Sequence, residues 1–353
     1  MKLSFRWYGV EDTVKLQYIR QIPNMYSIVT AIYDVPVGEV WSTNSILKLK
    51  EEVESVGLKF DVIESVPVHE DIKLGLPSRE IYIKNYKENI RNLSKAGVKV
   101  ICYNFMPVFD WTRTQLDKVL EDGSTALVYY KEQLAKMDPL KGELTLPGWD
   151  SSYTKDQLAE IFAKYEKVDE EVLWSNLKYF LQEIIPVAEE CDIKMAIHPD
   201  DPPYNIFGLP RIITNEKNLD RFLKLVDNKY NGLTLCTGSL GSASFNDVVH
   251  MVDKYSSQER IHFMHVRNVK LLEDGSFEES AHYSPSGSLD IVEIMRVLHK
   301  NHYDGYLRPD HGRMIWGETG RPGYGLFDRA LGAMYITGIW ETLEKTTKGE
   351  EAR

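Results

Sequence analysis

Four side chains of types that bind first-row transition metals stand at the ends of consecutive apolar segments in the second half of this chain. They are His198, Cys236, His265 and Asp310. Imidazole, thiolate and carboxylate groups are all ligands of such ions. If the segments are neighbouring parallel strands, their carboxyl ends meet at one place and the four side chains can surround one ion. The sequence therefore predicts a metal site with two histidines, a cysteine and an aspartate.

Each of these residues alone has an ordinary structural explanation. Cys236 could be a small buried apolar side chain, His198 or His265 could be hydrogen-bonded in the core, and Asp310 could cap a helix. Those explanations would have to hold for four adjacent strand ends together, so we favour the metal site. Cys236 is predicted to be a ligand and not a nucleophile, because no base adjoins it in the sequence.

The mixed ligand set also restricts the ion. Nitrogen and sulfur ligands suit Fe²⁺, Mn²⁺, Co²⁺ or Zn²⁺ better than Mg²⁺ or Ca²⁺, which prefer oxygen. The chain has 3 cysteines, no CxxC pair, and no apolar leader at its N-terminus. No segment approaches the roughly 18 apolar residues of a membrane span. We therefore expect a reducing, cytoplasmic environment.

Basic and polar residues gather around the predicted strand ends. With 42 Lys and Arg against 53 Asp and Glu, the net charge is −11, which argues against nucleic acid or an anionic membrane as partner. Arginines near a metal site in an acidic protein indicate a small carboxylate or phosphate ligand. The residues expected to contact substrate are Arg6, Trp7, Asn104, Arg267, Asn268 and Arg313. Arg308 and Arg321 could equally lie near this site or at the protein surface.

Two residues are candidates for proton transfer. His311 adjoins the predicted ligand Asp310 and belongs to a residue type that titrates near neutrality. Tyr324 lies in the loop RPGYG, which could fold over the site, but it is one of 20 tyrosines and its position alone gives weak support. His69, after the third apolar segment, is a weaker candidate for contacting substrate.

Eight short apolar segments, most of them followed by an amphipathic helical stretch, predict a parallel (β/α)₈ TIM barrel formed by residues 1–353 as one domain. The segments are 2–7, 25–32, 58–65, 98–105, 193–199, 232–238, 261–266 and 305–311. A doubly wound open sheet is less compatible, because the first strand ends FRWYG and no Gly-rich phosphate turn follows it. Helices are predicted over 80–97 and 288–301, the second with Ser288 as N-cap.

A long connection separates the fourth and fifth predicted strands. Residues 106–172 exceed what a βα unit needs, so we expect a mainly helical insertion there, followed by a barrel helix at 174–185. The insertion leaves from the carboxyl end of a strand, where barrel enzymes hold their sites, which favours a lid. A structural or dimer contact is the alternative, and a homodimer is compatible with the sequence.

Several segments resemble the mannonate dehydratase family of the hexuronate (glucuronate) pathway. They are MKLSFRWYG, AIYDVPVGEVW, IHPDDPP, LCTGSLG, HVRN and RPDHGRMIWGETGRPGYGLFDR, and the similarity extends over essentially the whole chain. The resemblance implies a TIM barrel that uses Mn²⁺ or Fe²⁺ to remove water from D-mannonate, giving 2-keto-3-deoxy-D-gluconate. It also implies that the four strand-end residues hold the ion and that His311 and Tyr324 are catalytic.

Two other functions stay open at this point. A sugar isomerase or epimerase uses a similar barrel and a divalent metal, but usually binds the metal through carboxylates and histidines, so Cys236 speaks against it. A metal-stabilised scaffold would close its site with four ligands and no cationic surroundings. Arg267, Arg313 and His311 argue for an open, catalytic site instead.

Overall fold

Eight parallel strands form a closed barrel in this computed structural model, which describes residues 1–140 and 154–351. The order around the barrel is β1-β12-β9-β8-β7-β4-β3-β2. These strands are β1 (Lys2–Arg6), β2 (Ser27–Thr30), β3 (Lys59–Glu64), β4 (Val100–Tyr103), β7 (Lys194–Ile197), β8 (Asn231–Cys236), β9 (Ile261–Val266) and β12 (Tyr306–Pro309). Each lies within one of the predicted apolar segments or begins one residue before it, so the predicted TIM barrel is confirmed.

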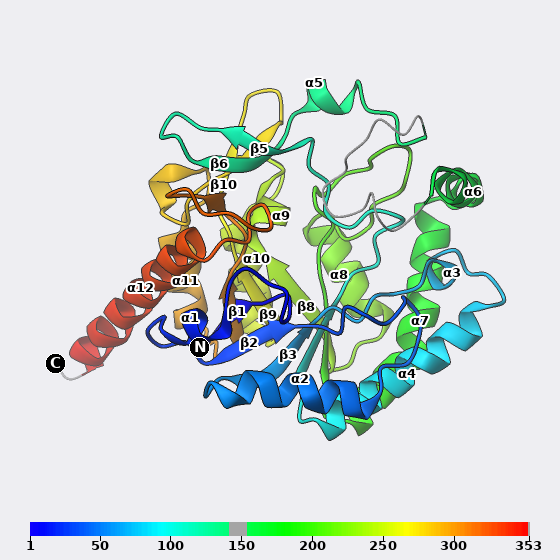
Figure 1. The fold of residues 1–353 in the computed structure, drawn as a ribbon, viewed down its shortest axis with the longest axis horizontal. Coiled ribbons are helices and arrows are strands. Elements are labelled where there is room, and N and C mark those ends of the chain that lie inside the picture. The colour runs from blue at the N-terminus through cyan, green and yellow to red at the C-terminus, as the bar shows by residue number, and fades with distance from the viewer. Residues whose placement is uncertain (141–153, 352–353) are drawn as a thin grey trace.

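Helices lie around the outside of the barrel (Figure 1). They are α1 (Leu16–Arg20), α2 (Thr43–Ser55), α3 (Glu70–Lys73), α4 (Arg79–Lys95), α7 (Glu170–Glu190), α8 (Glu216–Leu225), α9 (Thr237–Gly241), α10 (Val248–Ser257), α11 (Ile291–Lys300), α12 (Phe327–Glu351) and the 3₁₀ turn Ser284–Ser286. Among the described residues, no helix is both long and apolar enough to cross a membrane.

The helix boundaries follow local capping. On α4 the apolar residues Ile83, Tyr86, Ile90 and Leu93 recur at helical spacing and are all buried. The predicted cap Ser288 is wrong for α11. Asp290 is the N-cap, and its carboxylate accepts a hydrogen bond from the backbone N–H of Glu293 at 3.1 Å.

The predicted insertion over 106–172 contains helices, as expected, and also two strands that were not predicted. Besides α5 (Lys131–Leu134) and α6 (Lys155–Tyr165), its described part contains β5 (Gln115–Val119) and β6 (Thr125–Tyr129), and the part of it over 141–153 lies outside the described residues. These strands form a hairpin because Asp122-Gly123 supplies a turn, with Gly123 at φ 80°, before the alternating segment TALVY.

The hairpin belongs to a small antiparallel sheet with β10 (Val269–Leu271), β11 (Phe277–Glu279) and β13 (Arg313–Met314). β10 follows barrel strand β9 directly and β13 follows β12, so the sheet lies at the carboxyl end of the barrel strands. The insertion thus contributes the hairpin β5–β6 to a second sheet. This sheet lies beside the predicted active-site end of the barrel (Figure 1).

Candidate metal centre and active site

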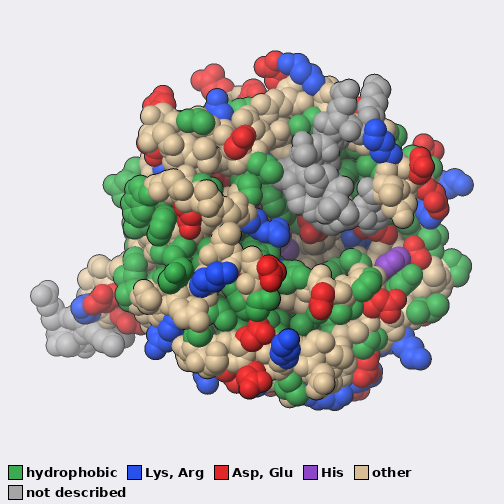
Figure 2. All heavy atoms as spheres, viewed as in Figure 1, with side chains coloured by type: hydrophobic (Ala, Val, Ile, Leu, Met, Phe, Trp, Pro, Cys, Tyr) green, Lys and Arg blue, Asp and Glu red, His purple; other side chains and the backbone are tan. Residues whose placement is uncertain are grey.

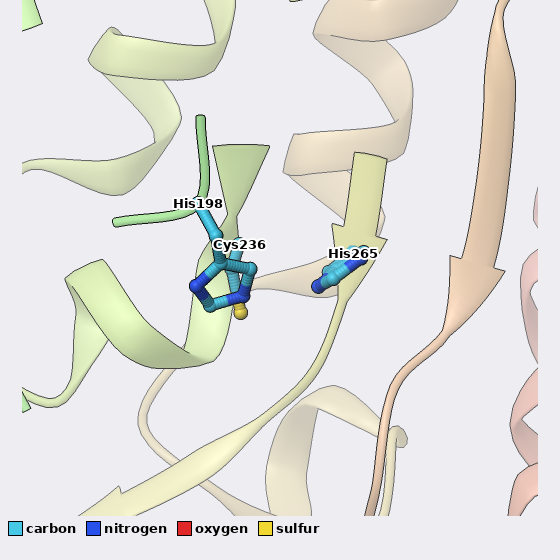
Figure 3. Close-up of side chains that lie close together, drawn as sticks. All are labelled: His198, Cys236 and His265. Carbon is cyan, nitrogen blue, oxygen red and sulfur yellow. The ribbon is translucent and has the colours of Figure 1, made fainter. Parts of the chain in front are cut away.

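Three of the four predicted metal ligands meet at the carboxyl end of the barrel. His198 follows β7, Cys236 ends β8 and His265 lies on β9, where it is the register partner of Cys236. Their ligand atoms all lie within 4.8 Å of one another. Figure 3 shows the three side chains converging from adjacent strands. They form a group that could hold a metal ion.

Asp310 lies beside this group without being a member of it. Its Oδ2 is 3.5 Å from Sγ of Cys236 and 3.8 Å from Nδ1 of His265. Its Oδ1 accepts a hydrogen bond from Arg308 at 2.6 Å. Burial would raise the pKa of Asp310, but Arg308 and neighbouring histidines hold that pKa well below its usual value, so the carboxylate is ionised.

The hydrogen bonds around these residues fit a transition-metal ion. Nδ1 of His198 is 2.7 Å from the Pro199 carbonyl oxygen, which can only accept, so Nε2 of His198 keeps a free lone pair. Sγ of Cys236 accepts hydrogen bonds from the backbone N–H and the hydroxyl of Ser239, at 3.4 and 3.1 Å. Nδ1 of His265 lies 3.4 Å from Nη2 of Arg308, which can only donate, so the lone pair of His265 is on Nδ1.

His198, one of the three residues of the candidate metal group, lines a polar cavity. The other lining residues are Arg6, Tyr8, Glu64, Ser65, Cys102, Tyr103, Asn104, Met106, Asp110, Trp111, Asp201, Arg267, Arg308, Asp310, His311 and Tyr324. Figure 2 shows a hollow near the centre of this face in which basic, acidic and histidine side chains are visible. The cavity therefore brings together His311, Tyr324 and three of the residues predicted to contact substrate, Arg6, Asn104 and Arg267.

Three residues predicted to contact substrate do not line this cavity. Trp7 packs in the hydrophobic core, because strand alternation turns Arg6 and Tyr8 inward and Trp7 outward. The side-chain oxygen of Asn268 accepts a hydrogen bond from the backbone N–H of Leu289 at 3.0 Å, which holds the loop before α11 in place. Arg313 is paired with acidic residues outside the cavity.

A buried network of charges surrounds the predicted catalytic residue His311. Arg267 lies 2.8 Å from Asp201 and 3.4 Å from both Glu279 and Asp310. Arg113, from the insertion, pairs with Asp201 at 2.8 Å and with Glu279 at 2.7 Å. Burial would raise the pKa of Asp201, but the two arginines hold that pKa well below its usual value.

His311 and Tyr324 are adjacent, with ring centroids 5.3 Å apart. Burial lowers the pKa of His311 well below its usual value, with Arg267 adding to that effect against the opposing influence of Asp310. Burial raises the pKa of Tyr324 well above its usual value. The site thus combines a neutral imidazole with a protonated phenol, which suits one group to accept a proton and the other to donate one. His69 does not line the cavity but stacks on Tyr82 at 3.6 Å.

Comparisons with known proteins identify the family of this chain. The sequence profile of the family described as D-mannonate dehydratase (UxuA) matches residues 1–350. The chain belongs to this family. It is 59% identical to a mannonate dehydratase of Streptococcus uberis over 348 residues, covering 99% of this chain and 100% of that protein. It is 57% identical to mannonate dehydratase 2 of Halalkalibacterium halodurans, covering 97% and 99% of the two chains.

Solved structures show the same relationship. The crystal structure of mannonate dehydratase from Streptococcus suis serotype 2 superposes with a TM-score of 0.92 at 50% identity, covering 98% of this chain and 96% of that one. A xylose isomerase-like TIM barrel from Mycobacterium smegmatis reaches a TM-score of 0.57 at 15% identity, covering 93% and 88%. That second likeness shows the fold alone.

Several residues that line the cavity of this D-mannonate dehydratase family member were not predicted from the sequence. Glu64 ends β3 and pairs with Arg308 at 3.0 Å, and Arg308 is buried, not exposed. An acidic residue at the end of an apolar segment was the available signal for Glu64, as for Asp310. Asp201 stood in the segment IHPDDPP, but its pairing with Arg113 joins residues far apart in the sequence.

Proposed function

We propose that this cavity is where the chain converts D-mannonate to 2-keto-3-deoxy-D-gluconate, with Mn²⁺ or Fe²⁺ held by His198, Cys236, His265 and Asp310. As a member of the D-mannonate dehydratase family, the chain is a hydro-lyase that removes water from D-mannonate. The observation that carries the site assignment is a His/Cys group whose member His198 lines the same cavity as Asp310, His311 and Tyr324.

The ion is assigned from the donor set. Two imidazoles, one thiolate and one ionised carboxylate favour a first-row transition metal over Mg²⁺. When bound, the ion supplies Lewis-acid chemistry to a substrate carboxylate. The contact of His198 with the Pro199 carbonyl oxygen fixes the tautomer of its ring, and Sγ of Cys236 accepts two hydrogen bonds from Ser239. Both arrangements leave a lone pair available for the ion, which supports His198 and Cys236 as ligands.

Arg6, Asn104 and Arg267 bind the carboxylate and hydroxyl groups of the substrate. Arg6 lies over the ring of Tyr8, 4.7 Å from its centroid, and its pKa is raised above the usual value despite burial, so it stays cationic. Asn104 is held at the cavity wall by its hydrogen bond to Asp110 at 2.5 Å. Fixed polar groups of this kind orient a flexible sugar acid for reaction.

The two proton transfers belong to His311 and Tyr324. His311, which is neutral, takes the proton from C2 as the base. Tyr324, which keeps its phenolic proton, gives it to the departing 3-hydroxyl, so that the C3–O bond breaks and water leaves. The resulting enol tautomerises to the 2-keto product, and return of the proton from His311 to Tyr324 resets the site. The two rings are adjacent, with centroids 5.3 Å apart.

The experiment is incubation of Mn²⁺-loaded protein with D-mannonate carrying deuterium at C2. We expect one 2-keto-3-deoxy product per mannonate consumed, with the C2 deuterium lost to solvent. D-tagatose and D-psicose, as substrates of the alternative epimerase reaction, are expected to stay unchanged. Epimerised ketohexose with intact mannonate would contradict the proposal and favour the isomerase or epimerase function.

A further inference from the structure

We propose that Glu64 is a positioning residue of the metal centre, which fixes the ring of His265 so that its other nitrogen faces Cys236 and Asp310. This inference rests on the proposed function, because it concerns the metal site assigned there. It gives a role to an acidic residue of β3, a strand that supplies none of the four proposed ligands.

The two ring nitrogens of His265 face different partners. Nε2 lies 3.3 Å from Oε2 of Glu64 and makes no hydrogen bond within the described part of the chain. Nδ1 lies 3.4 Å from Nη2 of Arg308, which can only donate, so Nδ1 carries the lone pair of the ring and Nε2 its proton. Nδ1 also lies 3.8 Å from Oδ2 of Asp310, and that oxygen is 3.5 Å from Sγ of Cys236. Separations of 3.5 to 4 Å suit atoms that share one ion at bond lengths of about 2.0–2.3 Å. Nδ1 is therefore on the side of the predicted ion, and Nε2 is on the side of the carboxylate.

This arrangement is what a metal-binding histidine requires. Such a histidine usually donates its other ring N–H to a carboxylate or carbonyl, which sets the tautomer and raises the basicity of the binding nitrogen. His198 meets that requirement through the Pro199 carbonyl oxygen. Glu64 would do the same for His265.

Glu64 is itself held in place by arginines. Arg308 donates from Nε to Oε2 at 3.2 Å and from Nη2 to Oε1 at 3.0 Å. Arg6 donates to the backbone oxygen of Glu64 and lies 3.7 Å from its carboxylate. Arg308 also donates to Asp310 at 2.6 Å, so one guanidinium connects the carboxylate behind His265 with a second proposed ligand. The planar, fork-shaped guanidinium holds both carboxylates in fixed relative positions.

The same residues offer a second interpretation, in which Glu64 binds the ion itself. Ligand atoms of Glu64, Cys102 and His265 also lie within 4.8 Å of one another. Arg308 and Arg6 already neutralise Glu64, and a cation there would face two positive charges. The thiol of Cys102 accepts a hydrogen bond from Thr234 at 3.2 Å, and burial raises its pKa well above the usual value, so it keeps its proton. The geometry therefore favours a positioning role for Glu64.

The test measures metal affinity without substrate. Co²⁺ is titrated anaerobically into chelator-treated protein, against a competing chelator, and the absorption of the cobalt–thiolate bond to Cys236 is followed. We expect Glu64→Gln to weaken binding about 10- to 100-fold, the usual effect of losing such a partner. Asp61→Asn is the matched control, because Asp61 lies on the same strand but accepts from the hydroxyl of Tyr306. Asp61→Asn and Cys102→Ser are expected to bind within about twofold of the parent chain.

A double-variant measurement shows whether Glu64 acts through His265. In a His265→Ala background, adding Glu64→Gln is expected to change the affinity by less than about twofold. If Glu64→Gln does not fold by circular dichroism, Glu64→Asp replaces it, since its shorter side chain keeps the charge but withdraws from His265. For Glu64→Asp the expected weakening is at least threefold.

Three results would overturn the inference: unchanged affinity in the Glu64 variant, an effect of Glu64 that persists without His265, or a loss in Cys102→Ser as large as in Glu64→Gln. Because no mannonate is present, failure of the proposed function is recognised separately, as normal Co²⁺ binding in a parent chain that does not dehydrate mannonate.

Discussion

Arg267 donates a hydrogen bond from Nη1 to Nε2 of His311 across 2.8 Å. A guanidinium has no acceptor, so Nε2 of His311 is unprotonated and the proton resides on Nδ1, 3.5 Å from Oε1 of Glu279. The lone pair needed for proton abstraction is therefore covered by a residue proposed to bind the substrate. Movement of Arg267 toward the substrate carboxylate would uncover that lone pair when substrate is present.

Arg267→Lys tests this relationship. Lysine keeps the charge but cannot reach Asp201 and His311 together in a fixed fork. We expect kcat/KM for D-mannonate to fall about 10- to 100-fold, the equivalent of one hydrogen bond to a charged group, with unchanged metal content. Arg260→Lys is the control, because Arg260 pairs with Asp227 away from the cavity. Parent-like kcat/KM in Arg267→Lys would contradict the role.

Tyr324→Phe tests the role of the phenolic proton separately from the packing of the ring. The variant keeps the edge-on contact with Tyr8, whose ring centroid is 5.0 Å away, and loses only the hydroxyl. Turnover is expected to fall at least about 100-fold, the usual contribution of a general acid. Metal content by elemental analysis should match the parent chain, and Tyr283→Phe, at an exposed tyrosine, should keep full activity. Equal turnover in Tyr324→Phe would end its catalytic role.

The stability of the fold should depend on pH through His262. Burial, with a smaller effect of Lys194, lowers the pKa of His262 to about 3. The unfolded chain, with a histidine pKa of about 6.5, therefore binds a proton that the folded chain excludes. The free energy of unfolding falls as pH decreases from about 6.5 toward 3, by up to about 1.4 kcal/mol per pH unit.

His262→Gln removes this titration. Urea unfolding at pH 7 and pH 5 should show a loss of stability that is about 2 kcal/mol smaller in the variant than in the parent chain. An equal loss in both proteins would mean that His262 does not exclude the proton in the folded state.

Arg113 should stabilise the insertion against the barrel. Its side chain is fully buried and joins Asp201, which follows β7, to Glu279 on β11. Arg113→Met leaves two buried carboxylates without this partner, and we expect the free energy of unfolding to fall by about 3–5 kcal/mol. Lys136→Met, which breaks the exposed pair with Glu132, should leave the unfolding midpoint unchanged. A parent-like midpoint in Arg113→Met would contradict the role of Arg113.

The barrel and the convergence of His198, Cys236 and His265 could be predicted because local pattern determines both. Apolar segments marked the strands, and ligand types at their last residues marked the site. Residues beyond a strand end were harder to place. Asn268 and Arg313 lie in segments whose direction depends on the small antiparallel sheet, and that sheet contains the hairpin that was expected to be helical.

Strand alternation could have distinguished Arg6 from Trp7, since Trp7 directly follows Arg6, the last residue of β1, and adjacent side chains of an extended segment face opposite sides. Pairs such as Arg113 with Glu279 could not be predicted, because they join residues far apart in the sequence through packing. The homodimer, the cytoplasmic location and the role of 106–172 as a lid or dimer contact stay predictions.

The central claim is that a metal held by His198, Cys236, His265 and Asp310 enables mannonate dehydration. The most direct measurement is turnover of D-mannonate by chelator-treated protein before and after anaerobic reloading with Mn²⁺, beside a Cys236→Ser variant. We predict that the chelated protein stays folded but inactive, that Mn²⁺ restores 2-keto-3-deoxy-D-gluconate formation, and that the variant is impaired. Turnover that survives chelation, or a reloaded Cys236→Ser variant as active as the parent chain, would contradict the account.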